Sequence, residues 1–209
     1  MSVSMNHCVG VILAGGKSRR MLGPEKSLMQ LGSKPPVQWV ADAMGEQLEL
    51  VAVNANGDPK RFSFLGLPVI ADTVADDLGP LAGVLAGMLW AQSQQATHIV
   101  TAATDTPFLP DDLVLQMVQR AEVSGSSEPT VVMASSAGRI HPVFGLWPAA
   151  LAPALEDFLL KEDKRKILEF ARRYNLREVE FSADPVDPFF NINSPADMDQ
   201  ATALLGDLT

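Results

Sequence analysis

The sequence VGVILAGGKSRRMLGPEK occupies residues 9 to 26 and combines an apolar run, two glycines and several cations. Buried parallel strands read as short, unbroken apolar runs, so residues 9 to 14 are predicted to form a central strand of an α/β protein. Gly15 and Gly16 can adopt positive φ and let a ligand approach bare backbone N–H groups. The cations that follow are Lys17, Arg19, Arg20 and Lys26. Backbone donors and cations beyond the carboxyl end of a strand indicate a polyphosphate site.

Two common phosphate-binding loops do not fit this stretch. The Walker A pattern requires a glycine five residues before Gly16, where the sequence has Val11, and Gly10 lies inside the apolar run. The dinucleotide fingerprint fails because the two glycines are adjacent and Arg19 follows them. The loop therefore belongs to another class of phosphate-binding protein.

Length and composition favour a single domain spanning residues 1–209, with a hydrophobic content of 47% and a charged content of 20%. No stretch approaches the roughly 20 apolar residues of a membrane span. The first residues, MSVSMNH, lack the pattern of a secretory signal, so we expect a cytoplasmic protein that does not bind membranes. The one cysteine, Cys8, excludes an internal disulfide and a cysteine-rich metal site, and it is predicted to be a small core residue.

The net charge is −9, so non-specific binding to nucleic acid is not expected. The cations are nevertheless concentrated: of 16 Lys and Arg, five lie between Gly15 and Pro35 and six between Lys161 and Arg173. Two basic stretches on an acidic protein suit a pair of substrates that both carry phosphates. The second stretch taken alone could equally be a solvated basic face.

Apolar runs alternate with helical patterns over the first two thirds of the chain, which predicts a three-layer, Rossmann-like α/β fold with a mostly parallel central sheet. The predicted strands are 9–14, 50–53, 68–71, 98–103, 130–134 and 177–181, with two short extended runs separated by residues 135–138. The predicted helices are 37–48, 80–90, 110–122, 149–160 and 165–174, and a last one after Ser194. That last helix has a serine cap, a proline in its first turn and an early carboxylate at Asp197.

Three polar residues share a position in this pattern, because Asn54, Asp72 and Asp105 each follow the end of a predicted strand. Open parallel sheets bind their ligands at the carboxyl ends of the strands. A single Asn or Asp at such a place is also a common turn residue. Three of them on the edge that carries Gly15 favour a ligand site.

The chain resembles the nucleotidyltransferases that carry the signature L-A-G-G-x-S-x-R-M, and the double glycine is similar to that of the molybdenum cofactor guanylyltransferases. The matching residues are Leu13, Ala14, Gly15, Gly16, Ser18, Arg19, Met21 and Lys26. The resemblance continues in family order through NANGD, GPLAG and DTPFLP to NINSPADM. Two departures are Leu22, where the family commonly has glycine, and Glu25, which replaces the usual aspartate before the lysine.

The resemblance implies roles for individual residues. The implied nucleotide-binding residues are Leu13, Ala14, Gly15, Gly16, Lys26, Asn54, Asp72 and Asp105, with Lys26, Arg19 and Asp105 as catalytic residues and Asp105 as the Mg²⁺ ligand. Mg²⁺ is usually held by one or two carboxylates together with phosphate oxygens, which agrees with a lone aspartate. The implied division places nucleotide binding in about residues 1–110 and acceptor binding in about residues 111–209.

The acceptor part contains four candidates that the resemblance suggests. Asn191 and Asn193 lie two apart in an extended segment, so their side chains share a face, although Asn193 could instead cap the next helix. His141 resembles a residue near the acceptor pocket, but a lone histidine is more often structural. Arg165 lies in a basic run, residues 164–166, that would suit the rim of a site for a pterin phosphate.

The activity implied is transfer of GMP from GTP to the terminal phosphate of molybdenum-bound molybdopterin, with release of pyrophosphate. The partners would be GTP, the molybdopterin cofactor and, further along, a molybdoenzyme apoprotein or its chaperone. A phosphate monoester is already ionised near pH 7, so the reaction needs no general base. Two alternatives stay open at this point: cytidylyl transfer to the same pterin, and a carrier that binds nucleotide or pterin without turnover.

Overall fold

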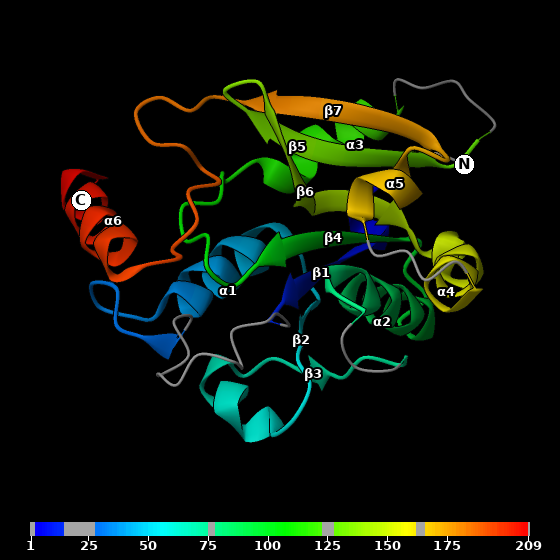
Figure 1. Ribbon diagram of the computed structural model, residues 1–209, viewed down its shortest axis with the longest axis horizontal. Helices are drawn as coiled ribbons and strands as arrows, with labels where there is room; N and C mark the ends of the chain where they lie inside the picture. The colour runs from blue at the N-terminus through cyan, green and yellow to red at the C-terminus, as the bar shows by residue number, and fades with distance from the viewer. Residues whose placement is uncertain (1–2, 15–27, 75–77, 123–127, 162–165, 209) are drawn as a thin grey trace.

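The computed structural model describes residues 3–14, 28–74, 78–122, 128–161 and 166–208. Its centre is a seven-stranded sheet with the order β3-β2-β1-β4-β6-β5-β7 (Figure 1). The strands are β1 (Cys8–Leu13), β2 (Val51–Asn54), β3 (Val69–Ile70), β4 (His98–Ala103), β5 (Thr130–Ser136), β6 (Arg139–Pro148) and β7 (Asn175–Phe181). All neighbouring pairs are parallel except the two that β6 makes with β4 and β5. The mostly parallel sheet is confirmed.

Strand β1 lies in the interior of this sheet, between β2 and β4. All six of its residues are buried, which explains why its sequence, CVGVIL, is apolar without alternation. Cys8 is its first residue and is only 5% exposed, so its prediction as a core residue is confirmed. The strand begins and ends one residue earlier than expected.

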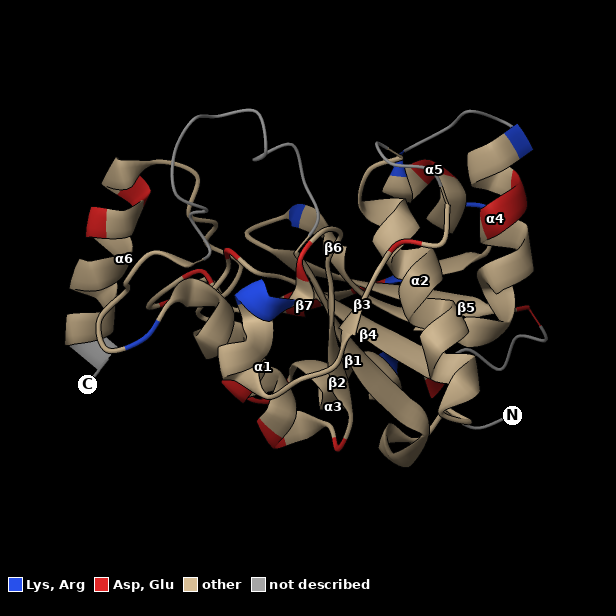
Figure 2. Cartoon of the chain, turned by 90° about the horizontal axis from the view of Figure 1, so that it is seen from below, with Lys and Arg blue, Asp and Glu red and all other residues tan. Residues whose placement is uncertain are grey.

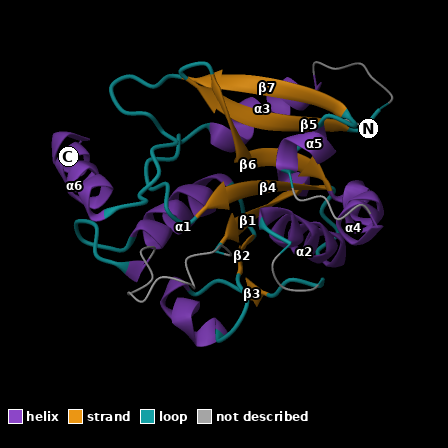
Figure 3. Ribbon diagram, in the orientation of Figure 1, coloured by secondary structure: helices purple, strands orange, loops and turns teal. Residues whose placement is uncertain are grey.

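Helices cover both faces of the sheet, as Figure 3 shows. One face carries α1 (Pro36–Gln47) and α3 (Leu113–Glu122), and the other carries α2 (Pro80–Ser93), α4 (Ala152–Lys161) and α5 (Ile167–Ala171). Each face has its own buried cluster of apolar side chains. We call these the α1/α3 side and the α2/α5 side of the sheet. The three-layer prediction is therefore confirmed.

The C-terminal helix α6 (Pro195–Leu208) lies at the opposite end of the molecule from α4 and α5 (Figure 2). A small separate cluster, with Leu31, Ile192 and Ala201 at its centre, packs it against the body of the protein. Its start is built as the sequence predicts: the Asp197 amide donates to Ser194 Oγ (3.2 Å), and the Ser194 amide donates to Asp197 Oδ2 (2.8 Å).

Short 3₁₀ segments fill out the remaining elements: η1 (Met5–His7), η4 (Pro59–Leu65) and η5 (Ala149–Leu151). The last of these corrects one prediction, because the expected helix 149–160 is divided into η5 and α4. The expected helix 165–174 is shorter and ends at Ala171, since a strand begins again at Asn175.

The largest difference from the expectation is β6. The sequence predicts two short extended runs around residues 135–138, whereas β5 continues to Ser136 and β6 runs for ten residues after a two-residue turn. The pairing is irregular between Met133 and Ala134. Met133 pairs with Gly145 and Ala134 pairs with His141, so the residues of β6 between His141 and Gly145 form a bulge, and such a bulge bends the strand. The bulge separates the two paired stretches of β6.

Candidate active site

The carboxyl edge of the central strands brings the candidate residues together. Leu13 at the end of β1 is in register with Asn54 of β2 on one side and with Ala103 of β4 on the other. The next amide, that of Ala14, donates to the carbonyl oxygen of Asn54 (2.9 Å). Strand β1 therefore ends between the strand end at Asn54 and the strand end that precedes Asp105, at the edge where open parallel sheets bind ligands.

A hydrogen-bonded cluster at β2 and β3 holds the carboxylate of Asp72. The Asn54 Nδ2 amide donates to Asp72 Oδ1 (2.9 Å) and to the carbonyl oxygen of Ile70 (3.3 Å). Asn56 Nδ2 donates to the other carboxylate oxygen, Asp72 Oδ2 (2.7 Å), and Asn56 Oδ1 accepts from the Asp72 amide (2.9 Å). Two carboxamides therefore fix both oxygens of one half-buried carboxylate.

These contacts distinguish the two residues that the sequence placed at the nucleotide. Asn54 is only 2% exposed, and the two hydrogens of its amide have acceptors within the protein. Asp72 keeps part of its surface open to solvent. The geometry favours Asp72 as the group that faces a ligand, with Asn54 behind it.

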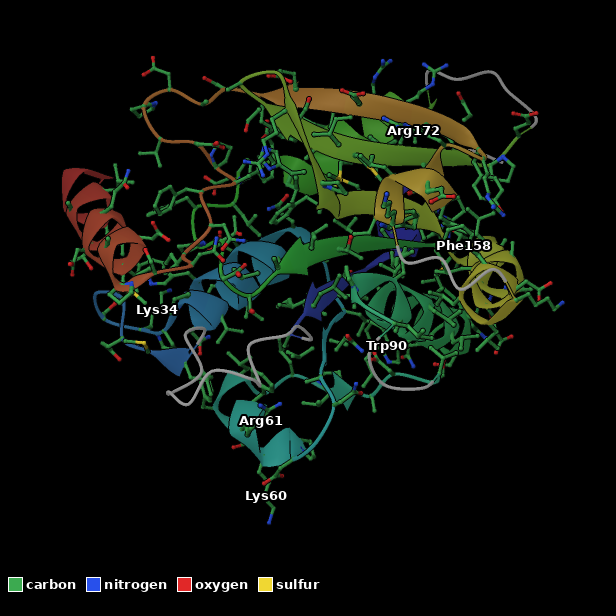
Figure 4. The ribbon with its side chains drawn as sticks, viewed as in Figure 1. Lys34, Lys60, Arg61, Trp90, Phe158 and Arg172 are labelled. Atoms are coloured by element: carbon green, nitrogen blue, oxygen red, sulfur yellow. The ribbon has the colours of Figure 1, made fainter. Side chains whose placement is uncertain are left out.

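Arg61, on η4, supports the same cluster from the side. Its Nη2 donates to the carbonyl oxygen of Asn56 (3.1 Å). In Figure 4 the neighbouring Lys60 points outward, away from the sheet. Arg61 therefore links η4 to the strand end, whereas Lys60 is a solvated cation.

Asp105 follows β4 and is joined to the segment that carries the two asparagines. The Ile192 amide donates to the carbonyl oxygen of Asp105 (2.9 Å), and Thr106 Oγ1 lies 3.5 Å from Asp105 Oδ1. Ile192 is 2% exposed, while Asn191 and Asn193 on either side of it are exposed. The two asparagines therefore lie beside the strand end of Asp105, on the outer face of their segment.

The structure also answers how the following helix is capped. Ser194 supplies the side-chain cap, and Asp197 Oδ2 accepts from the backbone amides of Asn193 and Ser194, each at 2.8 Å. The alternative that the Asn193 side chain is the cap of α6 is wrong.

His141 lies in a different environment from the other candidates. Its Nε2 is 2.8 Å from Ser136 Oγ, and that hydroxyl donates to Asp187 Oδ1 (2.9 Å). Because the single hydroxyl proton of Ser136 goes to Asp187, the Nε2–H of His141 is the donor to Ser136. Its ring stacks on Phe189 with 4.6 Å between the centroids. This order of donors runs opposite to that of a serine nucleophile activated by histidine.

Burial lowers the pKa of His141 below 6.5. The negative charge of Asp187 opposes that shift, Arg139 adds to it, and Glu180 opposes it again. The imidazole is therefore neutral near pH 7 and acts as a hydrogen-bond donor.

A cavity of about 670 Å³ opens on the α2/α5 side of the sheet. Its lining residues are Pro80, Pro142, Lys166, Ile167, Leu168, Glu169 and Arg172. Figure 4 shows Arg172 above α5, and Figure 2 shows segments of both charges close together on α4 and α5. His141 packs instead against Phe189, which belongs to the α1/α3 side. The ring of His141 thus packs on the α1/α3 side, whereas Lys166, the described residue of the basic run, lines the cavity on the α2/α5 side.

Five of the predicted site residues, namely Gly15, Gly16, Arg19, Lys26 and Arg165, lie outside the described residues. Three residues that sequence reasoning did not select are Asn56, Ser136 and Asp187. Asn56 had a local signal, since it lies two residues from Asn54 at a strand end. Ser136 and Asp187 had none, because they are 51 residues apart in the sequence.

Comparison with known proteins shows the family of this chain. Residues 10–178 match the MobA-like NTP transferase domain family. A molybdenum cofactor guanylyltransferase from Mesorhizobium japonicum is 48% identical over 204 residues, which cover 96% of this chain and 97% of that protein. This chain belongs to the MobA-like NTP transferase family. It is a nucleotidyltransferase.

Solved structures share the fold of this MobA-like transferase. Molybdopterin-guanine dinucleotide biosynthesis protein A from Archaeoglobus fulgidus superposes with a TM-score of 0.69 at 24% identity, covering 96% of this chain and 99% of that one. A manganese complex of Rv0371C from Mycobacterium tuberculosis superposes with a TM-score of 0.65 at 13% identity, covering 96% and 100%. At such identities the likeness concerns the fold alone.

Two properties of the described part of this MobA-like transferase bear on its chemistry. Within it, no three His, Cys, Asp or Glu side chains are grouped so as to hold a metal ion by themselves. None of its helices is both long and apolar enough to span a bilayer.

Proposed function

We propose that this protein transfers GMP from GTP to the terminal phosphate of molybdopterin and releases pyrophosphate. The observation that carries the proposal is the backbone bond between Ile192 and Asp105 (2.9 Å), because it joins the exposed asparagine segment to the edge where β1, β2 and β4 end. One substrate would bind over the glycine loop and the other along that segment, with Asp105 between them.

On the nucleotide side, Leu13, Ala14 and Asp72 would contact GTP, and Asn54 and Asn56 would hold Asp72. Asp72 keeps both its oxygens hydrogen-bonded and part of its surface open, which suits a carboxylate that accepts from a base or a ribose. Gly15, Gly16, Arg19 and Lys26 would bind the phosphates, and this assignment rests on the signature that they match.

On the metal side, Asp105 would be the protein ligand of Mg²⁺. One half-buried carboxylate, which belongs to no group of three or more possible metal ligands among the described residues, fits a cation that completes its shell with water and phosphate oxygens. When bound, Mg²⁺ neutralises charge on the phosphates of GTP and on the departing pyrophosphate.

The reaction itself needs alignment more than proton transfer. An oxygen of the acceptor phosphate attacks the α-phosphorus of GTP, a new P–O bond forms, and the bond to the bridging oxygen breaks as pyrophosphate leaves with the electron pair. The attacking phosphate is already ionised near pH 7, so the neutral, donating imidazole of His141 is not required as a base. Lys26 and Arg19 would neutralise charge on the phosphates.

On the acceptor side, Asn191 and Asn193 would hydrogen-bond the pterin, and the basic run with Arg165 and Lys166 would bind its phosphate. The cavity lined by Lys166, Glu169 and Arg172 includes this lysine of the run. Pro80 also lines it, one helical turn before Gly83, the residue of α2 that touches Asn54. His141 would act indirectly, through Ser136 and Asp187, on the segment that leads to Asn191. The product would pass in the cytoplasm to a molybdoenzyme apoprotein or its chaperone.

The test is pyrophosphate release with Mg²⁺ and molybdopterin, comparing GTP with CTP, ATP and UTP. We expect release that is selective for GTP and absent without the pterin. A preference for CTP would keep the mechanism and change the nucleotide. Binding of nucleotide and pterin without release would identify a carrier and contradict the proposal.

A further inference from the structure

We propose that Gly83 is a positioning residue for nucleotide binding: its missing Cβ lets helix α2 pack directly on the carboxamide of Asn54, and that contact orients Asp72. The inference rests on the proposed function in one respect, namely that Asp72 faces the nucleotide. It concerns the second glycine of the GPLAG stretch, residues 79–83, which no step of the chemistry above uses.

The contact is closer than any side chain would allow. A Cβ added at Gly83 would lie 2.2 Å from Asn54 Oδ1, 2.9 Å from Asn54 Cγ and 2.8 Å from Leu13 Cδ2. Both neighbours are residues of the candidate nucleotide site, at the ends of β2 and β1. Gly83 therefore touches the site through the backbone of α2.

Asn54 cannot yield to such a Cβ without losing its own contacts. It is 2% exposed, and its Nδ2 donates to Asp72 Oδ1 (2.9 Å) and to the Ile70 carbonyl oxygen (3.3 Å). Rotating the amide by half a turn would place an oxygen opposite the Asp72 carboxylate and would replace attraction by repulsion. Moving the side chain sideways would break the same bond. Either response releases one oxygen of Asp72.

Helix propensity argues that this glycine has a packing reason. Gly83 lies in the first turn of a 14-residue helix, where alanine would be the better helix former. Gly83 and its neighbours in α2 are buried, so the choice of glycine here is not explained by a solvent-exposed position. Close approach of the helix backbone to Asn54 accounts for it.

The same helix supplies a matched control. A Cβ at Gly87, one turn further along α2, would lie 2.8 Å from Val11 Cγ2 and 3.2 Å from Ile99 Cδ1. The crowding is of a similar kind, but these neighbours are apolar side chains within β1 and β4, away from the strand ends that carry the site. Gly87→Ala therefore tests the general cost of a methyl group under α2 without touching the Asn54–Asp72 pair.

The experiment compares Gly83→Ala, Gly87→Ala, Asn54→Ala and the double variant Gly83→Ala, Asn54→Ala. Binding of Mg·GTP and the KM for GTP are measured beside Tm. We expect Gly83→Ala to weaken GTP binding roughly tenfold or more, the loss of one hydrogen bond to a charged group, and Gly87→Ala to lower Tm with KM within about twofold of the parent. Asn54→Ala should weaken binding as Gly83→Ala does.

The double variant decides whether Gly83 acts through Asn54. Removing the carboxamide also removes the Asn54 atoms that the new methyl group would meet and leaves only its 2.8 Å approach to the end of the Leu13 side chain, so this variant is less crowded than Gly83→Ala alone. We expect its affinity for GTP to equal that of Asn54→Ala. An affinity several-fold lower than that of Asn54→Ala, or unchanged GTP binding in Gly83→Ala, would overturn the inference.

A failure of the proposed function would look different. If the parent protein binds Mg·GTP but releases no pyrophosphate, the transfer reaction is wrong while the binding comparison still tests Gly83. If Asp72→Asn binds GTP as the parent does, Asp72 does not face the nucleotide and the inference falls with it.

Discussion

The backbone amide of Ile192 donates a 2.9 Å hydrogen bond to the carbonyl oxygen of Asp105. This bond connects the strand end in the middle of the sheet with a segment from near the C-terminus. It places the exposed Asn191 and Asn193 beside the carboxylate to which we assign Mg²⁺. Two substrates that meet at one phosphorus atom require such a junction, because their reacting groups have to be aligned within about 3.5 Å.

Asp105→Asn should abolish transfer while leaving the fold intact. The amide has nearly the shape of the carboxylate and keeps a hydrogen-bonding oxygen, but it lacks the negative charge that holds a divalent cation. We expect kcat for pyrophosphate release to fall by about two orders of magnitude or more, with an unchanged circular dichroism spectrum. Asp111→Asn, at an exposed position further along the same loop, is the control and should retain activity. Normal turnover of Asp105→Asn would refute the metal assignment.

Asp187→Asn should weaken acceptor binding selectively. Asp187 Oδ1 accepts from Ser136 Oγ and from the Phe189 amide, both at 2.9 Å, and so ties the start of the segment to the β5–β6 hairpin. The amide keeps an oxygen that can accept both bonds but loses the negative charge, and hydrogen bonds to a charged group contribute about 1.5–3 kcal/mol against about 0.5–1.5 kcal/mol for neutral partners, so both bonds weaken. We expect a raised KM for the pterin with the KM for GTP within about twofold.

The control for this prediction is Asp184→Asn, at an exposed position three residues earlier. Equal effects of Asp187→Asn on both substrates would indicate general destabilisation instead of a role in the acceptor segment.

Protonation of His98 should destabilise the protein in acid. Burial lowers the pKa of His98 from 6.5 to about 4. Between pH 4 and pH 6.5 the unfolded chain binds a proton at His98 and the folded protein does not. The stability that the neutral His98 contributes is therefore complete above pH 6.5 and is lost as the pH falls toward 4. The shift corresponds to roughly 3 kcal/mol in the free energy of unfolding at most. Urea unfolding at several pH values should show a flatter profile for His98→Gln than for the parent. If His98→Gln and the parent showed the same dependence of stability on pH, the lowered pKa of His98 in the folded protein would be contradicted.

The sequence was informative wherever one segment carries its own signal. The buried strand β1 was recognisable because all its residues are apolar, and α6 because Ser194 and Asp197 cap it locally. The strand ends near Asn54 and Asp105 could be placed on one edge of the sheet because strands connected through helices are expected to be parallel, and the carboxyl ends of parallel strands lie on the same edge. These inferences need only the order of residues along the chain.

Strand β6 was harder to predict for identifiable reasons. It contains Pro142 and Gly145, which usually weaken a strand, and a bulge accommodates them. Its turn has Ala137 at φ 48° and Gly138 at φ 72°, a geometry normally signalled by Asn-Gly and here occupied by Ala-Gly. Contacts such as that of Ser136 with Asp187 form only in the folded chain, so the sequence could not predict the hydrogen bond between His141 and Ser136 or the stacking of His141 on Phe189.

Cys8 offers a direct test that the chemistry uses no thiol. It is the only cysteine in the sequence, it is 5% exposed at the start of β1, and its Sγ donates to the Ser4 carbonyl oxygen (3.3 Å). Burial raises its pKa to about 12, so little thiolate exists at pH 8. We expect labelling by iodoacetamide to be slow in the native protein and to become fast only as urea unfolds it, and Cys8→Ala to keep its activity. Rapid labelling of the folded protein, with loss of transfer, would show that β1 opens or that the thiol participates.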